Sequence, residues 1–339
     1  MNRIIGPQAT HSAISAVTNT ALEVKWLTVD EESAGQRLDN FLIRHLKGVP
    51  KTHVYRIIRS GEVRVNKGRA AADTRIEIGD VVRLPPVRIS DKVAEKAARP
   101  APGREFPLLL EDDALMAIDK PAGVAVHGGS GVSFGIIEQL RQARPQAKLL
   151  ELVHRLDRET SGILLVAKKR SALKHLQDQF RERETGKTYL ALVQGNWPEK
   201  LKVIDSSLHK YLLPDGERRV KVTTPEDPDG MRSITLVKVS ERLHGCTLLE
   251  VTIKTGRTHQ IRVHLASRGH PIAGDDKYGD FEWNKTLNKQ GLKRMFLHAW
   301  RLQFTHPTTG KRLELKSNLP EELQQFTHHA KPKPSTPSV

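Results

Sequence analysis

Residues 105–324 are made up largely of short runs in which apolar side chains alternate with polar ones or stand together. Runs such as GILLVAKK, KTYLALVQG and CTLLEVTIKTG have the length and period of β-strands. Similar runs are LLLEDDALMAIDK, SITLVKVSERL, IRVHLASRG and WRLQFTHP, while FGIIEQLRQARP, ALKHLQDQFRERE and PEELQQF have helical spacing. Successive strands with helices between them predict an α+β domain built on a mixed, mostly antiparallel sheet with flanking helices.

A second, smaller pattern precedes this region. The stretches QRLDNFLIRHL and THVYRIIRSG carry apolar residues at helical spacing, and Gly61 is a typical helix stop. EVRVN and TRIEIGDVVRL then alternate as short strands do. Two helices followed by a small sheet predict a compact α/β module.

Composition divides the remaining chain. The segments expected are a flexible N-terminal tail at 1–24, the small module at 25–90, a linker at 91–104 rich in Pro, Ala and charge, the large domain at 105–324, and a disordered C-terminal tail at 325–339. No run of 18 apolar residues occurs, so no membrane span is expected.

The charge of the chain indicates its kind of partner. With 55 Lys and Arg against 39 Asp and Glu, the formal net charge is +16, which favours a polyanion bound through its phosphates. An anionic membrane is the alternative, but a basic amphipathic helix with exposed large apolar residues is not evident. Cys246 is the one cysteine, which excludes a disulfide within the chain and a thiolate metal cluster and fits the reducing cytoplasm.

The usual motifs for metals and nucleotides are not found in the sequence. The histidines available as ligands are His127, His154, His259, His264, His270 and His298. None has a zinc-type spacing, and His259 and His264 would lie on opposite faces of the strand expected there. Phosphate-binding GxxxxGK[ST] and GxGxxG loops and the GxSxG elbow of serine hydrolases do not occur either. The sequence therefore predicts neither a metal nor a cofactor.

One carboxylate stands out by its position. Asp157 lies in HRLDRETSG, directly before the apolar run GILLVAKK, so it is expected at the rim of the sheet. A loop aspartate between Arg155 and Arg158 is most often a surface ion pair worth about 0–1 kcal/mol. A carboxylate pair with Glu159 is a second reading, although no separation can be inferred within a loop. A third is a single carboxylate acting as nucleophile or base.

Several long motifs in a fixed order decide among these readings. Five stretches together resemble the RluA-type pseudouridine synthases: KPAGVAVHGG, HRLDRETSGILLVAKK, KTYLALVQG, TGRTHQIRVHLASRGHPIAGDDKYG and LHAWRLQF. The small module resembles the S4 RNA-binding domain through RLDNFL, VYRIIRSGEVRVN and GDVV. The first resemblance extends over most of residues 110–305, and the second over about 50 residues.

The synthase resemblance assigns roles to five residues. It implies that Asp157 is the catalytic aspartate, that Arg262 pairs with it, and that Tyr189 packs on the target base. Leu297 matches an apolar residue on the other side of the pocket, and Arg155 an arginine that fills the space left by the extruded uridine. Whether the aspartate attacks the sugar, attacks C6 of the base or removes the 2′ proton stays open. No cofactor is implied.

The S4 resemblance implies contacts with structured RNA. Residues 36–88 hold 12 Lys/Arg against 5 Asp/Glu, a net charge of +7 (12 − 5). The basic residues expected on the polar sides of the two helices are Arg37, Arg44, Lys51, Arg56 and Arg59. Together, the synthase resemblance and the S4 resemblance imply a cytoplasmic, monomeric isomerase that acts on uridines of large-subunit ribosomal RNA. Alternatives are a related synthase acting on transfer RNA, or a non-enzymatic RNA-binding protein, which would not need Asp157, Tyr189 and Arg262 together.

Overall fold

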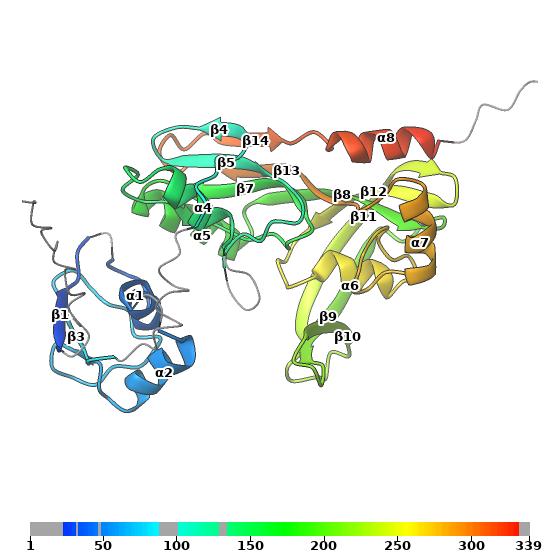
Figure 1. Ribbon diagram of the computed structural model, residues 1–339. Coiled ribbons are helices and arrows are strands. Elements are labelled where there is room, and N and C mark those ends of the chain that lie inside the picture. The colour runs from blue at the N-terminus through cyan, green and yellow to red at the C-terminus, as the bar shows by residue number, and fades with distance from the viewer. Residues whose placement is uncertain (1–22, 32, 47–48, 88–100, 129–133, 332–339) are drawn as a thin grey trace, which may run out of the picture. The chain divides into compact units, whose positions relative to one another are not determined.

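The computed structural model describes residues 23–31, 33–46, 49–87, 101–128 and 134–331 (Figure 1). The chain divides into two compact units, residues 1–100 and 101–339, and each is described by itself. Most of the expected tail at 1–24, most of the expected linker at 91–104 and residues 332–339 lie outside the described residues.

The smaller unit contains two helices and a three-stranded sheet. Its elements are β1 (Lys25–Thr28), α1 (Leu38–His45), α2 (Lys51–Arg59), β2 (Arg64–Val65) and β3 (Val81–Leu84). The strands are antiparallel in the order β1-β3-β2. Phe41 and Leu42 on α1 are buried against Val54 and Ile57 on α2. The apolar residues at helical spacing therefore form the core of this unit, as the sequence predicts.

The larger unit contains one long mixed sheet. Its strands are β4 (Leu108–Glu111), β5 (Leu115–Lys120), β6 (Glu151–Leu152), β7 (Ser161–Ala167), β8 (Gly186–Gln194), β9 (Val203–Leu212), β10 (Arg218–Thr223), β11 (Met231–Leu243), β12 (Cys246–Ile253), β13 (Leu297–Thr305) and β14 (Arg312–Lys316). Their order is β10-β9-β11-β12-β8-β13-β7-β5-β4, with β14 beside β13 and β6 beside β7. Only the β13–β7 pairing is parallel among the described strands. The predicted α+β class is confirmed.

Helices cover both faces of this sheet (Figure 1). They are α4 (Ile136–Ala143), α5 (Arg170–Glu182), α6 (Gln260–Ala266), α7 (Phe281–Lys289) and α8 (Glu321–His329). Alternate residues of the central strands enter different core clusters: Ala191 of β8 packs with α6, whereas Leu192 packs with α7 and α8. Tyr189, on the same face as Ala191, contacts both the α6 cluster and the α4 cluster. The middle of β8 therefore lies where two parts of the core meet.

The structure differs from two expectations of the sequence. IRVHLASRG, expected as a strand, contains helix α6. Every residue from Gln260 to Leu265 is buried, so the helix has no solvent-facing side and shows no helical alternation of polar and apolar residues. The disordered C-terminal tail was expected from residue 325, but α8 extends to His329, because Leu323 and Phe326 are buried in the core.

The sequence patterns also left some elements unassigned. Strands β9, β10 and β14 and helix α7 were not anticipated. The β9–β10 hairpin projects from the end of the sheet (Figure 1). None of the described helices is long and apolar enough to cross a membrane.

Candidate active site

Asp157 lies in the loop that leads from β6 into β7, at the rim of the sheet as the sequence predicts. The backbone N–H of Thr160 donates to the Asp157 carbonyl (3.2 Å), which closes a turn. Gly162 follows with φ +105°. A Cβ at this position would lie 2.3 Å from the carbonyl oxygen of Ala299, so only glycine allows β7 to pair with β13 here. The side chain of Asp157 keeps 23% of its surface exposed.

Lys120, at the end of β5, ties this loop to the sheet. Its Nζ donates to the carbonyls of Pro121 (2.8 Å), Arg158 (2.9 Å) and Thr160 (2.8 Å), and the residue is 1% exposed. Burial lowers the pKa of Lys120 below the ordinary lysine value. The three carbonyl dipoles nevertheless match the three N–H donors of an ammonium group. The loop that carries Asp157 is thus fixed from behind.

Lys120→Met is expected to lower the free energy of unfolding by about 1–3 kcal/mol, because the three carbonyls lose a buried donor. We also expect slower turnover, since the Asp157 loop is no longer fixed. Lys168→Met is the matched control: Lys168 forms a partly exposed ion pair with Glu111, worth about 0–1 kcal/mol. Chemical denaturation and a single-turnover assay test this, and equal losses in both variants would contradict the role given to Lys120.

Arg262, on α6, joins Asp157 to a buried acidic partner. Its Nε and Nη2 donate to the two carboxylate oxygens of Asp275, both at 2.7 Å. Nη1 donates to Oδ2 of Asp157 at 3.3 Å, and Nη2 also reaches Asp276 at 3.2 Å. The Arg262 and Asp275 side chains are 4% and 1% exposed. Such a bidentate pair holds the guanidinium in one orientation, which directs its remaining nitrogen at Asp157.

The protonation of this pair follows from its surroundings. Burial alone would raise the pKa of Asp275, but the hydrogen bonds and charge of Arg262 outweigh it and hold that pKa below the ordinary value. Burial likewise opposes the charge on Arg262, yet Asp275 and Asp157 raise its pKa. Both partners are therefore charged at neutral pH.

Tyr189 and Leu297 come from neighbouring central strands. Tyr189, on β8, is half-buried, and burial together with the charge of Asp157 raises the pKa of its hydroxyl. Leu297 begins β13, where it is paired in register with Ala191, and it is 3% exposed. The phenol is therefore protonated and able to donate a hydrogen bond.

A cavity of about 230 Å³ opens beside these side chains. Arg155, Asp157, Tyr189, Arg262 and Leu297 all contribute to its lining. All five synthase residues predicted from the sequence thus surround one space, although their positions span 143 residues of chain. The volume is below the ordinary range for drug-sized ligands and suits a single flat ring.

Other residues that line the cavity were not expected there from the sequence. They include Phe180, Lys187, Arg257 and His259. The Nζ of Lys187 lies 5.2 Å from the centre of the Phe180 ring, and burial lowers the pKa of this lysine. The GRTHQIR motif carried the available signal for Arg257 and His259, but His259 was considered only as a metal ligand.

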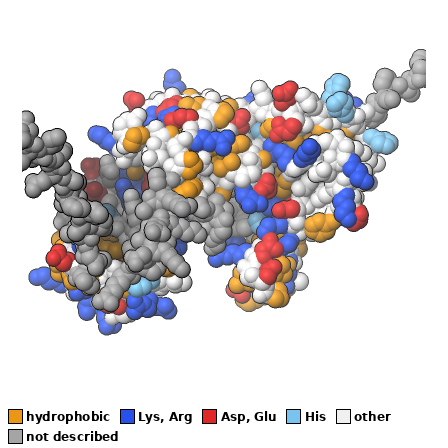
Figure 2. Space-filling view, viewed as in Figure 1, with side chains coloured by type: hydrophobic (Ala, Val, Ile, Leu, Met, Phe, Trp, Pro, Cys, Tyr) orange, Lys and Arg blue, Asp and Glu red, His pale blue; other side chains and the backbone are white. Residues whose placement is uncertain are grey.

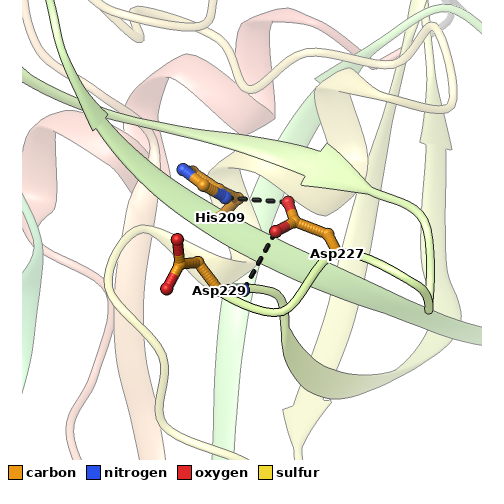
Figure 3. Close-up of side chains that lie close together, drawn as sticks. All are labelled: His209, Asp227 and Asp229. Atoms are coloured by element: carbon orange, nitrogen blue, oxygen red, sulfur yellow. Dashed lines mark hydrogen bonds and ion pairs between the residues drawn. The ribbon is translucent and has the colours of Figure 1, made fainter.

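One cluster outside the cavity has side chains that could ligate a metal: His209, Asp227 and Asp229 (Figure 3). Asp227 already accepts hydrogen bonds from His209 Nδ1 (2.8 Å), Thr223 Oγ1 (2.7 Å) and the Asp229 N–H (3.0 Å). Asp227 thus fastens the turn between β10 and β11 to β9, and these contacts account for the positions of the His209 and Asp227 side chains.

The basic residues predicted for the S4-like face belong to the smaller unit. Arg37, Arg44, Lys51, Arg56 and Arg59 are all exposed, and Lys and Arg side chains gather on the surface of this unit in Figure 2. Arg37 donates to Asp39 from Nε (3.1 Å) and Nη2 (2.7 Å), so part of its charge is neutralised. An open cavity of about 700 Å³ lies beside α2, with Tyr55, Arg59 and Arg69 on its border.

Two family models match parts of this chain. Residues 114–267 match the family model described as RNA pseudouridylate synthase, and residues 36–82 match the S4 domain. The chain is 51% identical over 304 residues to the ribosomal large subunit pseudouridine synthase C of Haemophilus influenzae, covering 89% of this chain and 93% of the relative. This chain belongs to the RNA pseudouridylate synthase family.

Similarity to other pseudouridine synthases supports this assignment to the family. The ribosomal large subunit pseudouridine synthase C of Escherichia coli K12 is 50% identical over 308 residues, which cover 89% of this chain and 95% of the relative. Human RNA Pseudouridylate Synthase Domain Containing 4 superposes with a TM-score of 0.55 at 28% identity, over 66% of this chain and 92% of the human chain. Like these synthases, the protein is an isomerase with an α+β catalytic fold.

Proposed function

We propose that this synthase converts specific uridines of large-subunit ribosomal RNA into pseudouridine, with Asp157 as the catalytic carboxylate. The arrangement of Arg262 carries the proposal. Its guanidinium is held by buried Asp275 and donates to Asp157 at the edge of a cavity sized for one ring. A buried arginine that aims at a partly exposed carboxylate is typical of a reacting centre rather than of a surface ion pair.

The reaction needs three things from this cavity: a carboxylate, contacts that hold the detached base, and a group that assists proton transfer. The N1–C1′ bond of uridine breaks, the base turns, and C5 bonds to C1′; a proton leaves C5 and N1 gains one. A carboxylate can act at the sugar or at C6 of the base without a cofactor. Between bond breaking and bond making the ring is detached, and Tyr189 and Leu297 would hold it on two sides. The protonated hydroxyl of Tyr189 can also assist a proton transfer.

Arg155 would act during entry of the substrate. A base stacked in a helix hides its reacting atoms and must turn outward to reach the cavity. Arg155 is exposed at the cavity lining, two residues before Asp157. Its long cationic side chain can occupy the space that the uridine vacates and contact the neighbouring phosphates.

Three observations support ribosomal RNA as the substrate class. The curated relatives at 50–51% identity are named for the ribosomal large subunit. An S4 domain precedes the catalytic unit, and its exposed arginines and lysine would contact RNA phosphates by shape and charge. The net charge of +16 suits a large polyanion. We propose that the enzyme acts as a monomer in the cytoplasm, where the reduced Cys246 would be stable.

The direct test offers purified enzyme large-subunit RNA, small-subunit RNA and transfer RNA in parallel. Pseudouridine is then quantified at each position after chemical labelling. We expect modification at a few defined uridines of large-subunit RNA. Modification of transfer RNA alone would refute the proposed substrate, and no product with any RNA would refute the proposed reaction.

The S4 face should contribute affinity through its binding to phosphates. Replacing Arg44, Arg56 and Arg59 together by glutamine is expected to reduce the slope of log affinity against log salt by about 0.7–0.9 for each phosphate that the variant no longer neutralises. The single-turnover rate at saturating RNA should stay unchanged, since these residues lie outside the catalytic unit. Filter binding at several salt concentrations measures the slope. An unchanged slope would show that this face does not bind phosphate.

A further inference from the structure

The β9–β10 hairpin is attached to the chain segment that follows Arg262's acidic partners. The backbone N–H of Val220, on β10, donates to the hydroxyl of Tyr278 at 3.0 Å. Next to it, Arg219 donates to the Lys277 carbonyl, and Lys277 pairs with Glu217 in the hairpin turn. The Tyr278 hydroxyl is therefore held in place by an element that otherwise projects from the sheet.

The same hydroxyl contacts His259, at 2.8 Å from Nδ1. The Tyr278 oxygen accepts from the Val220 N–H, and its one hydroxyl hydrogen can be directed at Nδ1, which accepts it in one of the two histidine tautomers. The ring hydrogen of a neutral imidazole must in that case be on Nε2. This nitrogen lies 4.0 Å from Oδ2 of Asp157, the oxygen that also accepts from Arg262.

We propose that Tyr278 and His259 are positioning residues for Asp157: Tyr278 fixes the histidine in the tautomer that directs its Nε2–H at the carboxylate. The inference rests on the proposed role of Asp157. The oxygen Oδ2 then accepts from the Arg262 guanidinium and faces the imidazole N–H of His259 as a second donor that is within reach. The other carboxylate oxygen stays available for the uridine.

The backbone supports a specific role for His259. It has φ 53° and ψ 19°, in the left-handed region, at the N-cap position directly before α6. A residue other than glycine is held there at some cost, and such strained positions concentrate at functional sites. The strain brings the ring to the cavity lining, where the side chain is 15% exposed.

Burial favours the neutral form of His259. Burial lowers the pKa of this histidine; Asp157 and Asp275 oppose the effect, whereas Arg262 and Lys277 add to it. A neutral ring has one N–H, so the direction of that hydrogen decides what the residue can do. The 4.0 Å separation between Nε2 and Oδ2 of Asp157 is longer than a hydrogen bond. Catalytic hydrogen bonds are often long without substrate and shorten in the complex, so we infer that this one closes when the uridine fills the cavity.

Two substitutions of His259 separate its nitrogens. Glutamine places an amide nitrogen near the Nε2 position and keeps a donor toward Asp157. Asparagine places its amide near Nδ1, toward Tyr278, and has no donor toward Asp157, although it suits the left-handed backbone better.

We expect His259→Asn to reduce the single-turnover rate at saturating RNA by about 10- to 100-fold, as for one hydrogen bond to a charged group. Its melting temperature should stay normal. His259→Gln should retain at least tenfold more activity than His259→Asn. Equal rates in the two folded variants would overturn the proposal.

The tautomer is measured without any activity assay. In ¹⁵N-labelled enzyme, the ring-nitrogen shifts of His259 should show hydrogen on Nε2 alone at neutral pH. Tyr278→Phe removes the hydroxyl and keeps the ring, so it should yield a mixture of tautomers and a rate lower by about two- to tenfold. Three results would each overturn the positioning role of Tyr278 and His259: hydrogen on Nδ1 in the wild type, a doubly protonated ring, or an unchanged tautomer in Tyr278→Phe. An inactive wild type would instead refute the proposed function, because the tautomer is read independently of it.

Discussion

Asp157→Asn is expected to reduce the single-turnover rate by on the order of 10⁴-fold or more, the scale seen when an enzyme loses its reacting group. Asparagine keeps the size of the side chain, and its amide oxygen can still accept from Arg262, now 3.3 Å from Asp157. The variant should therefore fold normally and bind RNA with nearly unchanged affinity. The loss should be confined to the chemical step.

The comparison needs a carboxylate that shares the loop but not the role. Glu159, two residues further on, forms an ion pair with Arg158 and does not line the cavity. Glu159→Gln should retain a rate close to that of the wild type. Similar rates for both variants in a single-turnover assay at saturating RNA would remove Asp157 from the reaction.

Arg262→Met should cost both stability and activity. The change leaves Asp275, 1% exposed, without its bidentate partner. Removing one member of a buried ion pair typically costs about 3–5 kcal/mol. Turnover should be lost as well, because Asp157 loses its guanidinium donor. Urea denaturation and the single-turnover assay measure the two effects.

A double variant separates these effects. Arg262→Met with Asp275→Asn removes both charges, so much of the stability should return while turnover stays lost. Recovery of turnover with stability would show that Arg262 acts only through folding.

The free energy of unfolding should also depend on pH through Asp275. Because the folded-state pKa of Asp275 is depressed, its stabilising contribution is present above the ordinary aspartate pKa and declines as the pH falls through the folded value. This part of the acid sensitivity should be absent from the double variant.

The sequence was most informative where a local pattern and a motif coincided. Asp157 directly precedes an apolar run of strand length, and this order alone predicts its place at the rim of the sheet. The same holds for Phe41 and Ile57, whose helical spacing predicted the core of the smaller unit. In these stretches, local propensity and tertiary packing favour the same structure.

Helix α6 shows why the rest could not be predicted. Its residues alternate as in a strand because polar Arg262 and His264 are buried together with Ile261 and Val263. Arg262 finds Asp275 inside the protein, and His264 Nδ1 contacts Thr235 Oγ1 at 2.9 Å. Periodicity assumes that polar side chains face water, and here tertiary partners replace the water.

Contacts between residues that are far apart in the sequence could not be predicted either. Tyr278 becomes notable only because folding brings it to His259 and to Val220 on a distant hairpin. Asp275, in the GDDKYG loop, shows no sign of being the buried partner of Arg262 in the linear sequence. A motif can mark such residues as a group, but which atom contacts which is decided by the packing of the sheet.

We propose that this enzyme isomerises uridines of large-subunit ribosomal RNA through Asp157. The most direct test of this proposal maps pseudouridine along that RNA from cells that lack the gene, complemented with the wild type or with Asp157→Asn. Defined pseudouridines should disappear in the deletion, return with the wild type and stay absent with Asp157→Asn. An unchanged map in the deletion, or restoration by Asp157→Asn, would contradict the proposal.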